Sequence, residues 1–293
     1  MAHYSVDDTT LSDIAYAIRS KTGSKRLLLA PEMSGAISGI IPPDGSLKGF
    51  IDGSLQNITL PDGMTVIGQR AFWGCRNLLS IDLPASLTTI GEGAFYDCPN
   101  LVLIELPSNL TAIGDNAFLG CSKLALNALP AGLTVINNFA FYGCSRMALK
   151  ELPDGVTRIG NSAFFNCTIL ALTRLPSGIT SIDQNAFYLC TKLALTTLPE
   201  GIQSIGLSAF NNCPNISFTE FPASVTNVLD YAFRQCVGLT SITFLGTPSL
   251  LSRTTFTLCT NLTTINVPWA EGAVAGAPWG ATNATINYNY TGG

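Results

Sequence analysis

The cysteines of this chain recur at one fixed spacing, which restricts the fold more than any other feature. Successive cysteines are 23 residues apart throughout, and the chain contains no others. A period of this length is typical of stacked copies of one small structural unit. The sequence therefore predicts a solenoid, a fold that mainly presents extended surfaces. The nine positions are Cys75, Cys98, Cys121, Cys144, Cys167, Cys190, Cys213, Cys236 and Cys259.

Other residues follow the same period. An Ala-Phe pair stands before each cysteine, except that the last copy reads Thr255-Phe256. Leu-Pro and Ile-Gly steps recur between these pairs, beginning with Leu60-Pro61 and Ile67-Gly68. Several coincident periods are a property of true repeats, so we place the repeat array at residues 50–268, with about nine to ten copies.

The cysteines first raise the question of disulfides or metal. Their number is odd, and all nine occupy one column of the repeat, whereas disulfide frameworks belong mainly to short secreted domains. Zinc sites need several clustered ligands, and the only histidine is His3. We therefore expect a ladder of buried, free thiols that behave as small hydrophobic groups, with no metal site and no cofactor.

Composition excludes several classes of protein. Hydrophobic residues make up 47% of the chain, charged residues only 12%, and the net charge is −4. Binding of nucleic acid is not expected, because it requires clustered Lys and Arg. No apolar run is long enough to cross a membrane, so no membrane insertion is expected. The first residues lack a charged segment followed by an apolar run, so no signal peptide is expected either.

Residues 1–45 lack the period and have helical signals. Thr10 is a candidate N-cap with Asp13 three residues later, and Pro31 is placed to begin a second helix. The sequence predicts a helical module here, with two interpretations: a cap over the first repeat, or a docking module. From Trp269 the period is also absent. Residues 269–293 end in alternating apolar positions at 286–290, which predicts a C-terminal β cap over the last repeat.

One repeat reads as two short extended segments and a turn. Leu78–Leu83 predicts a strand of a parallel sheet that ends at Pro84, and Leu87–Ile90 a second short strand. Gly93–Cys98 predicts a short helical turn that directs Ala, Phe and Cys inward. The expected fold class is therefore an α+β repeat solenoid.

The strand pattern changes along the array. Early and late copies read L-x-x-I-x-L, as at Leu78–Leu83, whereas copies from 124 to 221 read L-x-L-x-x-L. Because alternate strand residues face opposite sides, the inward set has shifted by one, with a bulge or an early strand end. Polar pairs such as Lys150-Glu151 should then face solvent.

Two surfaces are candidates for binding. One is the strand face, with Asp82, Glu105, Asn127, Lys150, Glu151, Arg174, Thr196 and Glu220. The other is the column after each phenylalanine, where aromatic residues could stack on sugars or contact a protein: Trp73, Tyr96, Tyr142, Phe165 and Tyr188. The alternatives are that the strand-face residues are merely solvated and that the aromatic residues pack on one another as a half-buried stripe.

The repeat unit resembles the BspA-like leucine-rich repeats. Residues 83–106, LPASLTTIGEGAFYDCPNLVLIEL, match that unit almost throughout, and the resemblance covers about three quarters of the chain. It implies a leucine-rich repeat fold. The family is known mostly from bacterial surface proteins, many of which adhere to host proteins, and this implies a similar role by analogy.

The two ends have a different resemblance. Residues 10–40, which include SDIAYAIRSKTGS, resemble an N-terminal segment of phage and prophage tail proteins from gut Firmicutes, and the ending VPWAEGAVAGAPWGATNATINYNY is similar to endings of such proteins. This implies a virion protein, which would need no signal peptide.

Three hypotheses follow. The first is a phage or prophage tail protein whose array binds a bacterial surface glycan or protein, with residues 1–45 contacting other tail proteins or sister subunits. The alternative is a cell-surface adhesin that binds host proteins. The third is a polysaccharide hydrolase, which the residues do not favour: with His3 outside the array, no catalytic constellation is recognisable, and we expect no enzyme.

Overall fold

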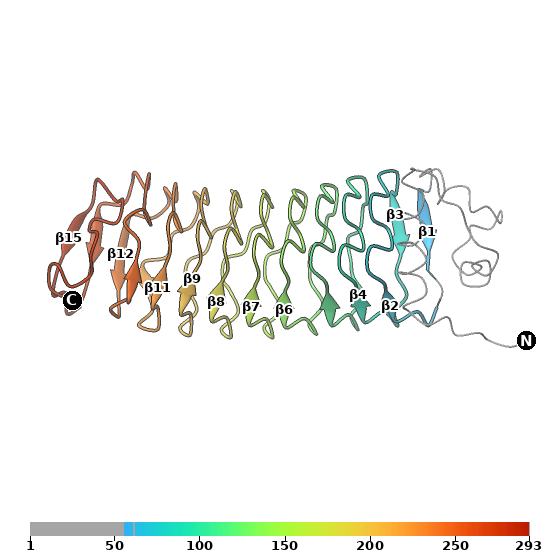
Figure 1. Cartoon of the computed structure of the whole chain (residues 1–293), viewed down its shortest axis with the longest axis horizontal. Helices are drawn as coiled ribbons and strands as arrows, with labels where there is room; N and C mark the ends of the chain where they lie inside the picture. The colour runs from blue at the N-terminus through green and yellow to red at the C-terminus, as the bar shows by residue number, and fades with distance from the viewer. Residues whose placement is uncertain (1–55, 61, 293) are drawn as a thin grey trace, which may run out of the picture.

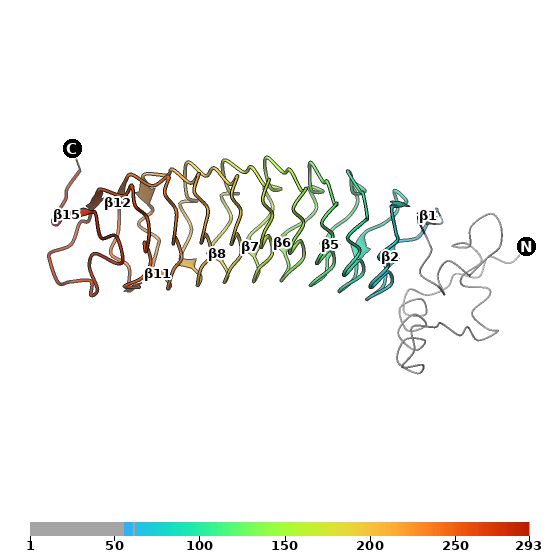
Figure 2. The ribbon, with the colours of Figure 1, turned by 90° about the horizontal axis from the view of Figure 1, so that it is seen from above.

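The computed structural model describes residues 56–60 and 62–292. This part of the chain coils into an elongated rod whose turns are stacked along the long axis (Figure 1). In the view from above, successive turns lie side by side from one end to the other (Figure 2). Short parallel strands and tight turns make up the described residues, which confirms the predicted repeat solenoid but not its α+β class, since these residues contain no helix. The predicted helical module at 1–45 lies outside the described residues.

The segments that precede each Leu-Pro step form one side of the rod, here called the Leu-Pro face. This face has strands only near its two ends. β1 (Asn57–Thr59) pairs in parallel with β3 (Ser80–Asp82). Toward the C-terminus, four strands lie in the order β10, β12, β14 and β15, with bounds Glu220–Phe221, Ser241–Phe244, Thr264–Asn266 and Thr285–Asn287.

The segments that contain the Ile-Gly steps form a second side, the Ile-Gly face. Its nine two-residue strands are β2 (Val66–Ile67), β4 (Thr89–Ile90), β5 (Ala112–Ile113), β6 (Val135–Ile136), β7 (Arg158–Ile159), β8 (Ser181–Ile182), β9 (Ser204–Ile205), β11 (Asn227–Val228) and β13 (Leu250–Leu251). The sheet is interrupted between β5 and β6. There Asn137 occupies the glycine position, and its side-chain Nδ2 donates to the Ile113 carbonyl at 2.7 Å, in place of the backbone amide that Gly114 uses in the preceding repeat.

The segment before each cysteine is the third side of the turn, and here the helical prediction is wrong. Gly93 and Asp97 both have left-handed φ values, of 58° and 55°, which a right-handed helix does not allow. Between them, the amide of Tyr96 closes a tight turn onto Gly93, while the amide of Phe95 donates to Ala117 of the next repeat at 2.8 Å. These bonds between repeats replace the hydrogen bonds of a helix. The described part of the chain contains strands and turns but no helix.

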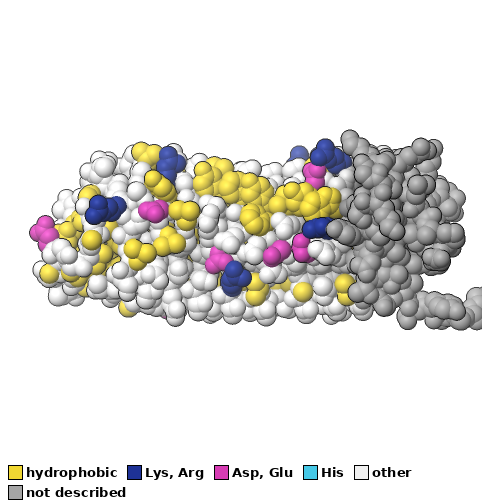
Figure 3. Space-filling model, viewed as in Figure 1, with side chains coloured by type: hydrophobic (Ala, Val, Ile, Leu, Met, Phe, Trp, Pro, Cys, Tyr) yellow, Lys and Arg dark blue, Asp and Glu magenta, His cyan; other side chains and the backbone are white. Residues whose placement is uncertain are grey.

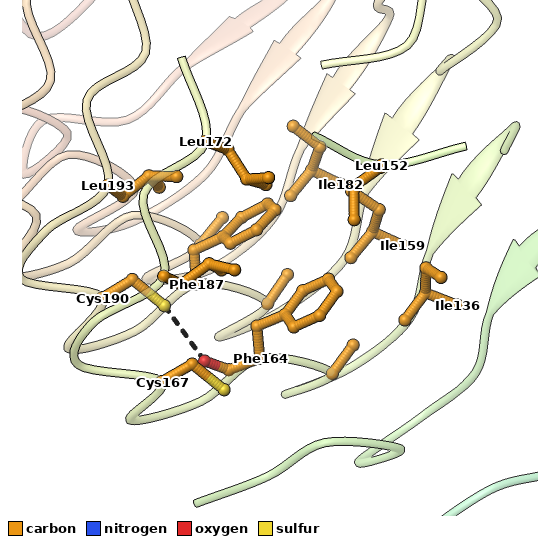
Figure 4. Close-up of a cluster of buried hydrophobic side chains, with 14 of the residues drawn as sticks. Ile136, Leu152, Ile159, Phe164, Cys167, Leu172, Ile182, Phe187, Cys190 and Leu193 are labelled. Carbon is orange, nitrogen blue, oxygen red and sulfur yellow. Dashed lines mark hydrogen bonds between the residues drawn. The ribbon is translucent and has the colours of Figure 1, made fainter. Parts of the chain in front are cut away.

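The interior consists of columns of identical side chains. The phenylalanine rings of successive repeats stack with centroids 5.2 to 5.9 Å apart, from Phe72 to Phe256. Beside them lie the cysteines, of which Cys98 to Cys259 are buried; Cys75, in the first repeat, is only half-buried, contrary to prediction. Leucine and isoleucine columns complete the core (Figure 4). Stacked aromatic pairs contribute roughly 1 kcal/mol each beyond the area that they bury.

The thiols also make hydrogen bonds. Cys190 Sγ donates to the carbonyl of Phe164 in the preceding repeat at 3.0 Å (Figure 4), and that carbonyl also accepts the amide of Cys167. The same thiol bond recurs from Cys98 to Cys259 at 2.9 to 3.2 Å. A buried thiol at this position therefore fills the volume of a small hydrophobic group and also donates to a buried carbonyl, which explains why the column is cysteine rather than alanine or valine.

The burial pattern confirms the predicted register change on the Leu-Pro face. In the repeat at 78–83 the buried residues are Leu78 and Ile81, whereas in the repeat at 170–175 they are Leu170, Leu172 and Leu175. The last shifted repeat, at 216–221, ends in β10, whereas the four before it, at 124–198, form no strand on this face. Each keeps a hydrogen bond from its alanine amide to a leucine carbonyl of the preceding repeat, for example Ala171 to Leu149 at 3.1 Å.

The C-terminal segment covers the last repeat. β15 pairs in parallel with β14 (Thr264 opposite Thr285), in the segment where the sequence predicts a terminal strand. Trp279 is fully buried, and its carbonyl accepts the amide of Phe256 at 2.8 Å. In the other repeats this amide bonds to the next repeat, which is missing at the end of the array. The C-terminal segment therefore supplies the hydrogen-bond acceptor that a further repeat would supply.

Candidate functional site

All eight predicted strand-face residues are exposed. They lie in two neighbouring columns of successive repeats on the Leu-Pro face, so the solenoid brings residues far apart in sequence into rows. Acidic residues occupy both ends of these rows, with Asp82 and Glu105 near the first repeat and Glu220 near the last. Lys150 and Arg174 lie in the middle. The rows have the variable polar surface that the sequence predicts, on a scaffold whose interior is uniform.

Some of these residues already bond to neighbouring side chains. Arg174 approaches Glu151 at 3.5 Å and Asp154 at 3.3 Å, so this cation is shared between two carboxylates. Thr59 donates its hydroxyl to Asp82 at 2.9 Å. In contrast, Lys150 forms no ion pair within the described residues. Exposed pairs of this kind contribute less than about 1 kcal/mol to stability, so their charges remain accessible to a partner.

The aromatic column is half-buried, and its rings stack on one another. Trp73 and Tyr96 are 3.8 Å apart between centroids, Tyr142 and Phe165 4.4 Å, and Phe165 and Tyr188 4.8 Å. Stacking covers the ring faces that a sugar would use and leaves the ring edges at the surface. The geometry therefore fits the stripe interpretation, with sugar stacking limited to the outermost rings.

Sequence reasoning missed a further set of residues on the Leu-Pro face. Four consecutive middle repeats read KLALN, RMALK, ILALT and KLALT, beginning at residues 123, 146, 169 and 192. Within each motif the second and fourth residues are buried, while the first and last are exposed. The recurrence of a basic residue two positions before a small alanine, in three of the four motifs, was the available signal. The set comprises Lys123, Arg146, Ile169 and Lys192, with Ala125, Ala148, Ala171 and Ala194.

The titratable groups of the described residues do not form a catalytic arrangement. Burial raises the pKa of the thiols, to about 12 for Cys121 and Cys259, which makes them poor nucleophiles. The hydroxyls of Ser252 and Thr254 lower the pKa of Asp230, which is an exposed carboxylate. No group of three or more His, Cys, Asp or Glu side chains within the described ranges could hold a metal ion. Charged side chains are sparse on the face shown in Figure 3, where hydrophobic side chains gather into an elongated band.

The comparison with protein families identifies the repeats. Residues 47–171 and 169–270 match the model of the BspA type leucine-rich repeat region, so the match covers more than half of the chain. The chain belongs to the BspA type leucine-rich repeat family. The match ends at 270, close to the point where the period is lost at Trp269. No curated protein matches the chain.

Solved structures of other leucine-rich repeat proteins are similar to this chain. The leucine-rich repeat protein of T. pallidum is 30% identical with a TM-score of 0.50, over 61% of this chain and 88% of that one. A leucine rich cell surface protein of Faecalibacterium prausnitzii is 26% identical with a TM-score of 0.44, over 81% and 80%. The pneumococcal vaccine antigen PcpA, at 17% identity and a TM-score of 0.50 over 81% and 68%, shares the fold.

Among the described residues, no helix is long and apolar enough to cross a membrane.

Proposed function

We propose that this protein is a cell-surface binding protein of the BspA type, whose Leu-Pro face binds a protein outside the cell. The proposal rests on the contrast between the inner and outer residues of the repeats. The inward columns are uniform and buried, whereas the polar columns on the Leu-Pro face are exposed and differ from one repeat to the next. A rigid scaffold with a variable outer row is suited to recognition rather than catalysis. Membership of a family of mostly bacterial surface proteins supports the location.

The test measures both binding and location. The purified chain is passed over immobilised host extracellular proteins, and intact cells of the source strain are labelled with gold-conjugated antibody. We expect saturable binding to at least one protein and labelling of the cell surface. Absence of saturable binding to every protein, or absence of the chain from the cell surface, contradicts the proposal.

A tail-associated role in a phage is the other candidate function. The resemblance of residues 10–40 and of the C-terminal ending to tail proteins favours it. The same antibody distinguishes the two roles when it is applied to purified phage particles. Labelling of tails, with none on cells, supports the tail protein and contradicts the surface protein. Deletion of residues 1–45 should then remove the chain from particles.

A further inference from the structure

We propose that the middle of the Leu-Pro face is a docking strip for an extended acidic segment of a protein partner. This inference rests on the proposed function, since it specifies where the array binds and what chemistry it recognises. The docking strip is defined by its alanine column and by four cations beside it: Ala125, Ala148, Ala171 and Ala194, with Lys123, Arg146, Lys150 and Lys192.

The four cations lack acidic partners. None of them forms an ion pair with a described residue, whereas Arg174 on the same face pairs with Glu151 and Asp154. Five cations and two anions therefore lie on this face between residues 122 and 197, in a chain whose net charge is −4. Unneutralised cations concentrated on one face of an acidic protein attract an acidic partner and orient its approach.

The centre of the strip is a row of small apolar side chains, the four alanines. The alanines of successive repeats are neighbours, because the amide of each bonds to the turn before it, as Ala148 does to Leu126 at 3.1 Å. The row spans three repeat steps of about 5 Å each, which is about 15 Å and equals four or five residues of an extended chain. Longer side chains lie on both sides of this row, including Lys123 on one side and Asn127 on the other.

The backbone of the strip is not used by a sheet. The amides of Asn127, Lys150 and Thr173 make no hydrogen bond within the described part of the chain, whereas the amide of Thr196, in the last repeat of the strip, donates to the Thr173 carbonyl at 3.1 Å. The corresponding segment of an early repeat is β3, whose residues pair with β1. The register change thus leaves polar backbone groups in the middle repeats that require water or a ligand.

Hydrophobic residues continue the strip toward the N-terminus and favour a protein over a polysaccharide. Ile104 is 57% exposed and Val102 47%, and Leu79, one repeat earlier in the same column as Val102, is 40% exposed. Ile169, between two cations of the strip, is 41% exposed. Exposed apolar residues beside charged ones are typical of protein interfaces, whereas an acidic polysaccharide has no apolar side chains to place on them.

The test selects random dodecapeptides from a display library on the full chain. We expect the selected peptides to be enriched in Asp and Glu, with apolar residues beside them, and to bind less tightly at higher salt. The double variant K123Q/R146Q should weaken the binding of a selected peptide about tenfold. The control variant R158Q/R253Q, which removes the same charge from elsewhere on the rod, should bind as the parent chain does.

A second pair of variants tests the alanine row without changing charge. Ala148→Trp fills the strip and should abolish peptide binding, whereas Ala131→Trp, at an exposed turn position, should not. Equal binding by K123Q/R146Q and its control, or full binding by Ala148→Trp, overturns the docking strip. So does binding of polygalacturonate when no acidic peptide is selected. If host proteins still bind these variants, the proposed function stands and only the strip is wrong; if the parent chain binds no protein or peptide, the proposed function fails.

Discussion

The ladder of buried thiols makes the stability of the array sensitive to alkaline pH. Burial raises the pKa of all eight fully inward thiols, from Cys98 to Cys259. In the unfolded chain the same thiols ionise near pH 8.5. Since the folded pKa is raised above the unfolded value, the contribution of each thiol is complete below about pH 8.5 and is lost as the pH rises toward the folded value, near 12 for Cys121.

The magnitude follows from proton linkage. One pH unit above the unfolded pKa, each thiol lowers the free energy of unfolding by about 1.4 kcal/mol, because the unfolded chain releases a proton that the folded chain keeps. Eight thiols together lower it by roughly 10 kcal/mol, which is comparable with the whole stability of an ordinary domain. We therefore expect the array to unfold between about pH 9 and pH 10 under conditions in which it is stable at neutral pH.

The assay is urea unfolding followed by circular dichroism, with a reductant present, at several pH values from neutral to about 9.5. The slope of stability against pH counts the thiols that become exposed together, so it also measures how many repeats unfold as one unit. Cys190→Ala should lower that count by one. A urea midpoint that does not change with pH refutes the reasoning, as does a Cys190→Ala variant with the slope of the parent chain.

Substitutions at three positions, Cys190, Gly114 and Leu258, test the packing at neutral pH, each by urea unfolding. Cys190→Ala should lower the free energy of unfolding by about 2 kcal/mol, because it loses side-chain volume and the hydrogen bond to the Phe164 carbonyl. Cys190→Ser should lower it by less, because its hydroxyl can still donate this bond. A larger loss for serine than for alanine contradicts the role of the bond. Gly114→Ala should lower the free energy of unfolding by about 1 to 3 kcal/mol, because its Cβ would lie 2.5 Å from the backbone nitrogen of Glu92. Gly178→Ala is the control and should be tolerated, since its Cβ would lie 3.6 Å from the nearest atom, a side-chain carbon of Thr157. Leu258→Asn should raise the free energy of unfolding by roughly 0.5 kcal/mol, since Leu258 has a φ of 61° that asparagine adopts more readily. A urea midpoint below that of the parent chain argues against backbone strain at this residue.

Much of the fold follows from the sequence because it is periodic. The buried cysteine column, the two extended segments and the register change were all predicted from residues that recur every 23 positions. The predicted helical turn at Gly93–Cys98 was wrong for a physical reason. A single repeat contains the right inward residues for a helix, but the amide of Phe95 bonds to the next repeat, which no local pattern reveals.

The candidate site was less predictable. Residues 101–106 read LVLIEL, which satisfies both strand registers, and the structure places Leu103 partly inside and Ile104 outside. The sequence of this repeat alone leaves the choice open, because either register buries one large apolar residue and exposes another. The cations Lys123 and Arg146 were overlooked for a related reason: they lie in the turn before the segment, where charged residues are ordinarily just solvated.

The register change connects the fold to the proposed docking strip. In the L-x-x-I-x-L repeats the sixth position after the cysteine is inward, as Ile81 is, and the backbone pairs as a sheet. In the four repeats at 124–198 the fifth position is buried instead, so Lys150 or Thr173 takes the sixth position on the outside, and these segments form no strand. The middle repeats thus give up strand hydrogen bonds but retain a full hydrophobic core. A loss of regular structure repeated in consecutive copies, with the same basic and small residues beside it, is better explained by binding at this surface than by a defect of packing.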